Sequence, residues 1–215
     1  MVAESAPPSD FMARALMLAR AHLGKVAPNP AVGCVLVRDA GVVGEGATQA
    51  GGRPHAEAVA LAMAGDLARG ATCYVTLEPC AHISTRGPSC ASSLVEAGIS
   101  ACIIAMIDPD IRTAGKGVAA LEAAGIRVSV GDGAAQAEDA AIGFLTRLRT
   151  GRPFLAVDGD PSSYDADFAL GFRESFEQAL DRMGAEGLTR VRVAPNTPIA
   201  LALAGRGLVD WFSNA

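Results

Sequence analysis

The stretch CYVTLEPC, residues 73–80, sets both the expected fold and the place of the expected site. Its first five residues form an apolar, β-branched run, which is typical of a strand buried inside a sheet. Glu78, Pro79 and Cys80 follow at the point where this strand ends. The sequence therefore predicts that a buried strand delivers Cys80, a candidate metal ligand, just beyond its carboxyl end.

Two further segments supply side chains that complement Cys80. The stretch HAEAVALAMAG, residues 55–65, predicts a helix that carries His55 and Glu57 in its first turn. Cys90 opens the next predicted helix, a position that we expect to lower the pKa of its thiol. Taken singly, a histidine is usually a surface or satisfied core side chain, and a buried cysteine a small hydrophobe. Because all four residues fall at the ends of elements, they can converge on one ion.

This donor set predicts a bound Zn²⁺. One neutral imidazole and two thiolates, from His55, Cys80 and Cys90, satisfy the ion, cancel its charge and leave a fourth tetrahedral position for water. Such a metal lowers the pKa of its water to roughly 7. A carboxylate that is not a ligand must then move protons, and we expect Glu57 to be this catalytic base. A purely structural zinc site needs no such base.

The rest of the chain alternates between expected helices and strands. The expected helices cover residues 10–24, 55–65, 90–98, 118–124 and 134–149, and the strands 31–37, 42–48, 73–77, 101–107 and 126–130. Strands that are apolar throughout and separated by helices favour helices on both faces of one sheet. We therefore expect a three-layer α/β/α domain.

Composition narrows the class of protein. The formal charge of −5 and the lack of a dense Lys/Arg cluster argue against a nucleic-acid partner. Five cysteines without disulfide-like spacing fit a reducing compartment, so we expect a cytoplasmic protein. The N-terminal residues lack the apolar core of a secretory signal, and no apolar run reaches the roughly 18 residues of a membrane span. We expect no membrane partner.

Several motifs are shared with a known family. They are PNPAVGC at 28–34, GGRPHAE at 51–57, YVTLEPCAH at 74–82, DPD at 108–110 and AGKG at 114–117. Together they make residues 10–150 resemble the zinc-dependent deaminase domain of riboflavin biosynthesis, a diaminohydroxyphosphoribosylaminopyrimidine deaminase with a cytidine deaminase-like fold. Nine residues separate Cys80 from Cys90, whereas transfer-RNA adenosine and cytidine deaminases have C-x-x-C. The loop is one residue longer than is usual in the family.

The resemblance implies roles for five further residues. Asn29 matches the asparagine that hydrogen-bonds the pyrimidine, with a turn residue between two prolines as the alternative. His82 and Arg86 match loop residues near the substrate phosphate, for which arginine is chemically suited. Lys116 matches a basic position near the same phosphate, and for all three a solvated side chain is the alternative. Asp108 matches a residue near the ribose, at the end of a strand.

The implied reaction is the hydrolytic deamination of 2,5-diamino-6-ribosylamino-4(3H)-pyrimidinone 5′-phosphate, a phosphorylated pyrimidine, with release of ammonia. One alternative is a zinc deaminase of another small nucleobase or nucleotide, which the altered loop between Cys80 and Cys90 permits. The other is a catalytically silent binding module, although Glu57 argues against it.

The resemblance thins over residues 151–215. GRPFL at 151–155 begins like the NADPH-dependent reductase domain of bifunctional relatives, and residues 172–212 resemble its late portion, but the middle is absent. We expect a truncated, reductase-like α/β segment without reductase activity, which packs on the deaminase or mediates self-association. A separate reductase is then needed for the next step.

Overall fold

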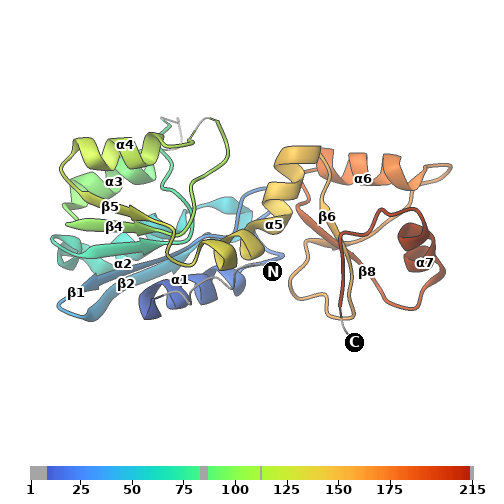
Figure 1. Cartoon of the computed structure of the whole chain (residues 1–215), viewed down its shortest axis with the longest axis horizontal. Helices are drawn as coiled ribbons and strands as arrows, with labels where there is room; N and C mark the ends of the chain where they lie inside the picture. The colour runs from blue at the N-terminus through green and yellow to red at the C-terminus, as the bar shows by residue number, and fades with distance from the viewer. Residues whose placement is uncertain (1–8, 83–86, 112, 214–215) are drawn as a thin grey trace, which may run out of the picture. The chain divides into compact units, whose positions relative to one another are not determined.

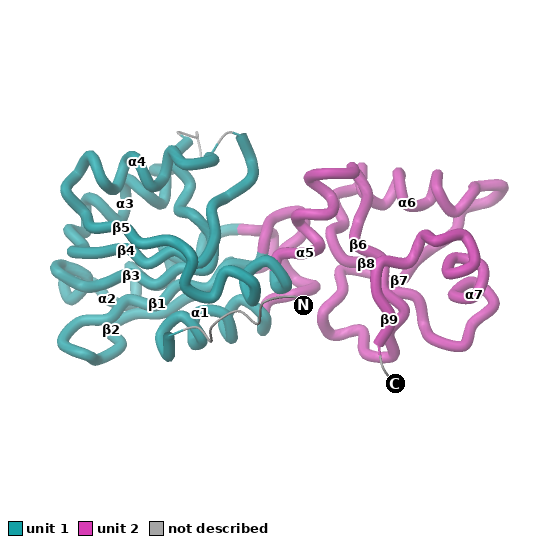
Figure 2. Tube along the Cα trace, viewed as in Figure 1, with its two compact units in different colours: residues 1–21, 31–49, 53–140 teal, residues 22–30, 50–52, 141–215 magenta. Residues whose placement is uncertain are grey.

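The computed structural model describes residues 9–82, 87–111 and 113–213 (Figure 1). By their internal contacts these residues form two compact units, coloured teal and magenta in Figure 2. The first unit contains the described residues of the ranges 1–21, 31–49 and 53–140, and the second those of 22–30, 50–52 and 141–215.

The first unit is built on a five-stranded sheet with the strand order β2-β1-β3-β4-β5. β1 pairs antiparallel with both β2 and β3, whereas β3, β4 and β5 run parallel to one another. The strands are β1 (Gly33–Arg38), β2 (Gly41–Ala47), β3 (Thr72–Val75), β4 (Ala101–Ile104) and β5 (Arg127–Val130). Asp39 and Ala40 join β1 to β2 and both have positive φ, as a two-residue hairpin turn requires.

The helices cover both faces of this sheet. A Cβ on Gly33 would lie 1.9 Å from the Ala15 carbonyl oxygen of one helix, and a Cβ on Gly46 would lie 2.7 Å from that of Ala56 in another. Gly46 is paired with Cys34, the strand neighbour of Gly33, and consecutive strand residues point to opposite faces. The two helices therefore lie on opposite faces, and the predicted three-layer α/β/α arrangement is confirmed. The helical elements up to residue 150 are α1 (Asp10–Arg20), η1 (Ala50–Gly52), α2 (Ala56–Ala64), η2 (Gly65–Ala68), α3 (Cys90–Ala97), α4 (Lys116–Ala123) and α5 (Ala134–Thr150).

The strands that lead to the site are shorter than the sequence predicts. β3 ends at Val75 and β4 at Ile104, although we expected them to run to residues 77 and 107. The segments beyond them still pair, but irregularly: the Ala105 amide donates to the Val75 carbonyl, and the Glu78 amide to that of Met106. The chain thus leaves the regular ladder just before Glu78.

The second unit contains a four-stranded sheet with the order β7-β8-β6-β9, in which every described pairing is parallel. Its elements are β6 (Phe154–Val157), β7 (Ala166–Asp167), α6 (Phe176–Ala185), β8 (Arg190–Val193), α7 (Pro198–Gly205) and β9 (Trp211–Phe212). Buried residues of β6, β8, α6 and α7 form its core, among them Leu155, Val191, Leu180 and Leu203. The predicted additional α/β segment at the C-terminal side is confirmed.

Across the ranges that the structure describes, none of the helices combines the length and the apolar composition that a bilayer crossing demands.

We expect Gly33→Ala to destabilise the protein by on the order of 1–3 kcal/mol, the usual cost of forcing extra atoms into a packed interior. The added Cβ would meet the Ala15 carbonyl oxygen at 1.9 Å, and this backbone is fixed inside α1. Gly41→Ala is the matched control in the same hairpin, because its nearest contact would be 3.5 Å. Urea unfolding followed by circular dichroism measures both. An unchanged midpoint for Gly33→Ala would contradict the close approach of α1 to β1.

Candidate metal centre and active site

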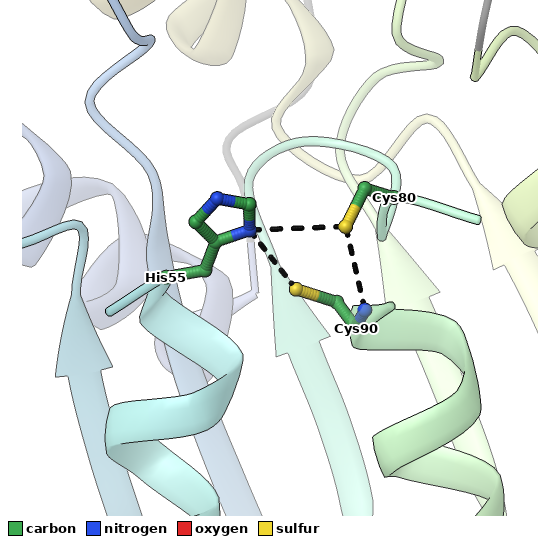
Figure 3. A group of neighbouring side chains, drawn as sticks. All are labelled: His55, Cys80 and Cys90. Carbon is green, nitrogen blue, oxygen red and sulfur yellow. Dashed lines mark hydrogen bonds between the residues drawn. The ribbon is translucent and has the colours of Figure 1, made fainter. Parts of the chain in front are cut away.

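Three element ends bring three potential metal ligands together. His55 is the residue before α2, Cys80 follows β3, and Cys90 is the first residue of α3. Their ligand atoms all lie within 4.8 Å of one another, and within the described ranges this is the one group of three or more His, Cys, Asp or Glu residues that meets this limit. Figure 3 shows the imidazole Nδ1 of His55 facing both sulfurs.

The distances and the donor atoms fit Zn²⁺. Nδ1 of His55 lies 3.2 Å from Sγ of Cys90 and 3.8 Å from Sγ of Cys80. Tetrahedral zinc, with Zn–S of ~2.3 Å and Zn–N of ~2.0 Å, separates nitrogen and sulfur ligands by about 3.5 Å. Thiolate ligands also favour zinc over hard cations such as Mg²⁺. The Cys90 backbone amide donates to Sγ of Cys80 at 3.3 Å and so holds that sulfur in place.

The two sulfurs differ in their proton affinity. Hydrogen bonding between the thiols lowers the pKa of Cys80 to about 4, with help from His55, and the same contact raises the pKa of Cys90. The expected lowering of the Cys90 pKa at a helix start is therefore wrong. Direct contact with a second sulfur outweighs the helix terminus, since one proton is shared between the pair. A bound cation removes this proton, because metal ligands must be deprotonated.

Glu57 lies in the first turn of α2, two residues after His55, and its side chain is only 4% exposed. Burial raises the pKa of its carboxyl group. The carboxylate also interacts with the Cys90 thiol, so it lies beside the ligand group. This is the location that a proton-transferring group needs.

A cavity of about 360 Å³ opens beside the ligand group. It has room for a small heterocyclic ligand, since small-molecule sites typically span roughly 300–1,000 Å³. Arg53 is the one charged residue among those that line it apart from the ligands. The lining residues are Arg53, Pro54, His55, Ala58, Gly87, Pro88, Cys90 and Ser93.

The remaining predicted site residues differ in how the structure places them. Nδ1 of His82 is buried and has no hydrogen-bond partner among the described residues. Arg86 lies outside the described residues. Asn29 belongs to the second unit, where its side chain lies against Gly52: a Cβ there would be 1.9 Å from Nδ2 of Asn29. Contact of these three residues with substrate stays a prediction.

Asp108 and Lys116 flank one loop that follows β4. Asp108 is buried and its carboxylate accepts a hydrogen bond from the Asp110 amide at 2.9 Å. Lys116 is exposed, and its Nζ donates to the Ile111 carbonyl at 3.1 Å. The phosphate contact of Lys116 and the ribose contact of Asp108 also stay predictions.

Sequence reasoning gave no role to Glu78. In the structure its side chain is 3% exposed and accepts hydrogen bonds from four backbone amides of residues 108–118. A charged residue directly after a buried apolar strand was the available signal, because such a residue needs partners inside the protein.

Comparison with known proteins supports a zinc site at these residues. The family described as "Cytidine and deoxycytidylate deaminase zinc-binding region" matches residues 6–106. The riboflavin biosynthesis protein RibD of Escherichia coli K12 is 50% identical over 147 residues, which are 68% of this chain and 40% of that protein. A solved structure of Acinetobacter baumannii RibD superposes with a TM-score of 0.77 at 26% identity, over 93% of this chain and 83% of that one.

The diaminohydroxyphosphoribosylamino-pyrimidine deaminase of Buchnera aphidicola is 41% identical over 143 residues, which are 97% of that protein and 66% of this chain. The chain belongs to this deaminase family. The predicted resemblance and the predicted cofactor Zn²⁺ are confirmed, the latter by the matched zinc-binding region and by the His/Cys/Cys group. The chain spans 40% of the length of the Escherichia coli member of the family.

We expect Cys90→Ala to reduce the zinc content from about one ion per chain to well below half of this after dialysis, since metal affinity depends on the complete ligand set. Cys102→Ala is the matched control, because this buried thiol of β4 lies outside the ligand group. Metal analysis by mass spectrometry measures both variants. Retention of stoichiometric zinc by Cys90→Ala would refute its assignment as a ligand.

Proposed function

We propose that this chain catalyses the hydrolytic deamination of 2,5-diamino-6-ribosylamino-4(3H)-pyrimidinone 5′-phosphate in riboflavin biosynthesis. The observation that carries the proposal is the His55, Cys80 and Cys90 group with buried Glu57 beside it. The Buchnera aphidicola relative, a diaminohydroxyphosphoribosylamino-pyrimidine deaminase of which the chain covers 97%, supports the same reaction.

His55, Cys80 and Cys90 would hold the metal, and Zn²⁺ when bound supplies a Lewis acid that lowers the pKa of water toward about 7. Glu57 accepts a proton from the attacking water as the water oxygen bonds to the ring carbon that bears the amine. Glu57 then gives this proton to the adjacent ring nitrogen. A second transfer through Glu57 protonates the amine, the C–N bond breaks and ammonia leaves. Water is consumed, and the ring amine becomes a carbonyl group.

Recognition of the substrate is proposed to involve the cavity and the loops around it. Asn29 is assigned to the pyrimidine, Asp108 to the ribose, and His82, Arg86 and Lys116 to the phosphate. Nδ1 of half-buried His82 has no hydrogen-bond partner among the described residues, and this supports a ligand contact for that residue, because a buried polar atom without a partner is costly.

Two other functions compete with this proposal. A deaminase of another small nucleobase or nucleotide would use the same metal group, and substrate profiling separates it from the favoured reaction. A silent binding module is disfavoured by Glu57, since burying a carboxylate beside two thiols is unfavourable and a structural metal site does not require it.

We further propose that residues 10–150 form the deaminase domain and that residues 151–215 form a reductase-like segment without reductase activity. Strands β7 and β9 of this segment are two residues long each, which leaves little sheet edge on which to hold a nucleotide. A separate reductase would then act on the deaminated product. Self-association and a cytoplasmic location stay predictions.

The test is ammonia release from the diaminopyrimidine ribosyl phosphate by zinc-loaded protein, without NADPH. We expect Glu57→Gln to retain zinc and to lose a factor of about 10²–10⁴ in kcat, the usual contribution of a general acid–base group. Glu96→Gln, at an exposed position of α3, is the matched control and should match the wild-type rate.

Wild-type turnover in Glu57→Gln would exclude Glu57 as the base. Absence of ammonia from folded, zinc-loaded wild-type protein would move the proposal to another nucleobase. NADPH oxidation in the presence of the product would contradict the proposed lack of reductase activity.

A further inference from the structure

The carboxylate of Glu78 is a buried anchor for the loop that carries Asp108 and Lys116. Its Oε1 accepts hydrogen bonds from the Gly117 amide at 2.8 Å and the Val118 amide at 3.1 Å. Its Oε2 accepts from the Gly115 amide at 2.9 Å and, less closely, from the Asp108 amide at 3.3 Å. Each oxygen therefore accepts from two backbone amides, and the four amides together come from both ends of the segment 108–118.

Only a carboxylate at position 78 satisfies all four amides. Two of them, from Gly117 and Val118, belong to the first turn of α4, where backbone N–H groups have no partner inside the helix and favour a negative charge. Hydrogen bonds to an ionised acceptor are stronger than those between neutral groups. The ordering of the described part of this segment therefore depends on the carboxylate side chain at position 78.

Gly117 provides an independent sign of the same close contact. A Cβ at this position would lie 2.1 Å from the Pro79 carbonyl oxygen and 3.0 Å from Cγ of Glu78. The start of α4 thus packs directly on the backbone that precedes Cys80, closer than any side chain would permit.

We propose that Glu78 is a positioning residue, which fixes the segment 108–118 to the chain that leads to the metal ligand Cys80, so that Asp108 and Lys116 face the substrate. The proposal rests on the proposed function. Glu78 lies two residues before Cys80 and binds the Asp108 amide directly, so the metal ligand and the substrate-binding segment share one anchor. Glu78 itself is fully enclosed and acts through the segment that it holds.

The test is Glu78→Gln in the full chain loaded with zinc. Glutamine keeps the size of the side chain but turns an NH₂ group toward two backbone donors. We expect zinc to stay at one ion per chain. KM should rise at least about tenfold, because the loss of a supporting residue around a metal site commonly reduces activity by this factor. The change in kcat should be much smaller. Hydrogen exchange of peptides that contain residues 113–118 should rise, whether or not the substrate has been identified correctly.

Two further variants make the result specific. Gly117→Ala keeps the charge of Glu78 but blocks the close contact, so it should give the same rise in KM and in exchange. Asp165→Asn is the matched control in the second unit: one Asp165 oxygen accepts from the amides of Thr189 and Arg190 and from the Thr189 hydroxyl, so a comparable set of bonds is lost. It should leave KM and the exchange of residues 113–118 unchanged.

Unchanged KM and unchanged exchange in folded Glu78→Gln would overturn the proposal, as would an equal rise in KM for Asp165→Asn. If Glu78→Gln does not fold, Gly117→Ala decides in the same way. If the wild-type protein releases no ammonia from the pyrimidine, the proposed function fails, while the exchange of residues 113–118 still reports whether Glu78 holds the segment.

Discussion

The pairing of β3 with a strand on each side is the constraint on which the site depends. β1 binds one edge of β3 in antiparallel register and β4 binds the other in parallel register. The hydrogen bonds on both sides of β3 fix the position and the direction of the strand, and therefore the place where the chain continues to Glu78 and Cys80. The loops that follow β3 and β4 leave on the same side of the sheet because parallel strands end at the same edge. The metal group and the segment 108–118 are neighbours for this reason.

Two buried glutamates on this framework have opposite surroundings. Glu57 lies beside thiols, and its burial outweighs its hydrogen bonds and its attraction to His55, so its pKa is raised. Glu78 is equally buried but is surrounded by four amide donors. A carboxylate that must exchange protons benefits from the first environment, and one that must hold a fixed shape benefits from the second. The difference comes from backbone geometry and not from the type of residue.

The parts of the structure that the sequence predicted are those with a local signal. The apolar run before Glu78 and the helix starts at His55 and Cys90 each have a recognisable pattern, and the structure brings the predicted ligands together. The contact between the two sulfurs, which raises the pKa of Cys90 instead of lowering it, depends on the tertiary structure and has no local signal in the sequence. The four amides that bind Glu78 lie 30 to 40 residues away from it in sequence. Strands of two residues, such as β7 and β9, are too short to show any periodicity.

Glu78 holds its loop through main-chain amides, and this has a consequence for how the protein family can change. The Ile111 side chain, which is 84% exposed, takes no part in this anchoring, so it can be replaced without breaking the four hydrogen bonds to Glu78. Under the proposed function, variation there can alter which ring or sugar is accepted while the backbone keeps its shape. A site of this kind can diversify its specificity by single substitutions, and the loop is the natural target for a library that redirects the enzyme to new heterocycles.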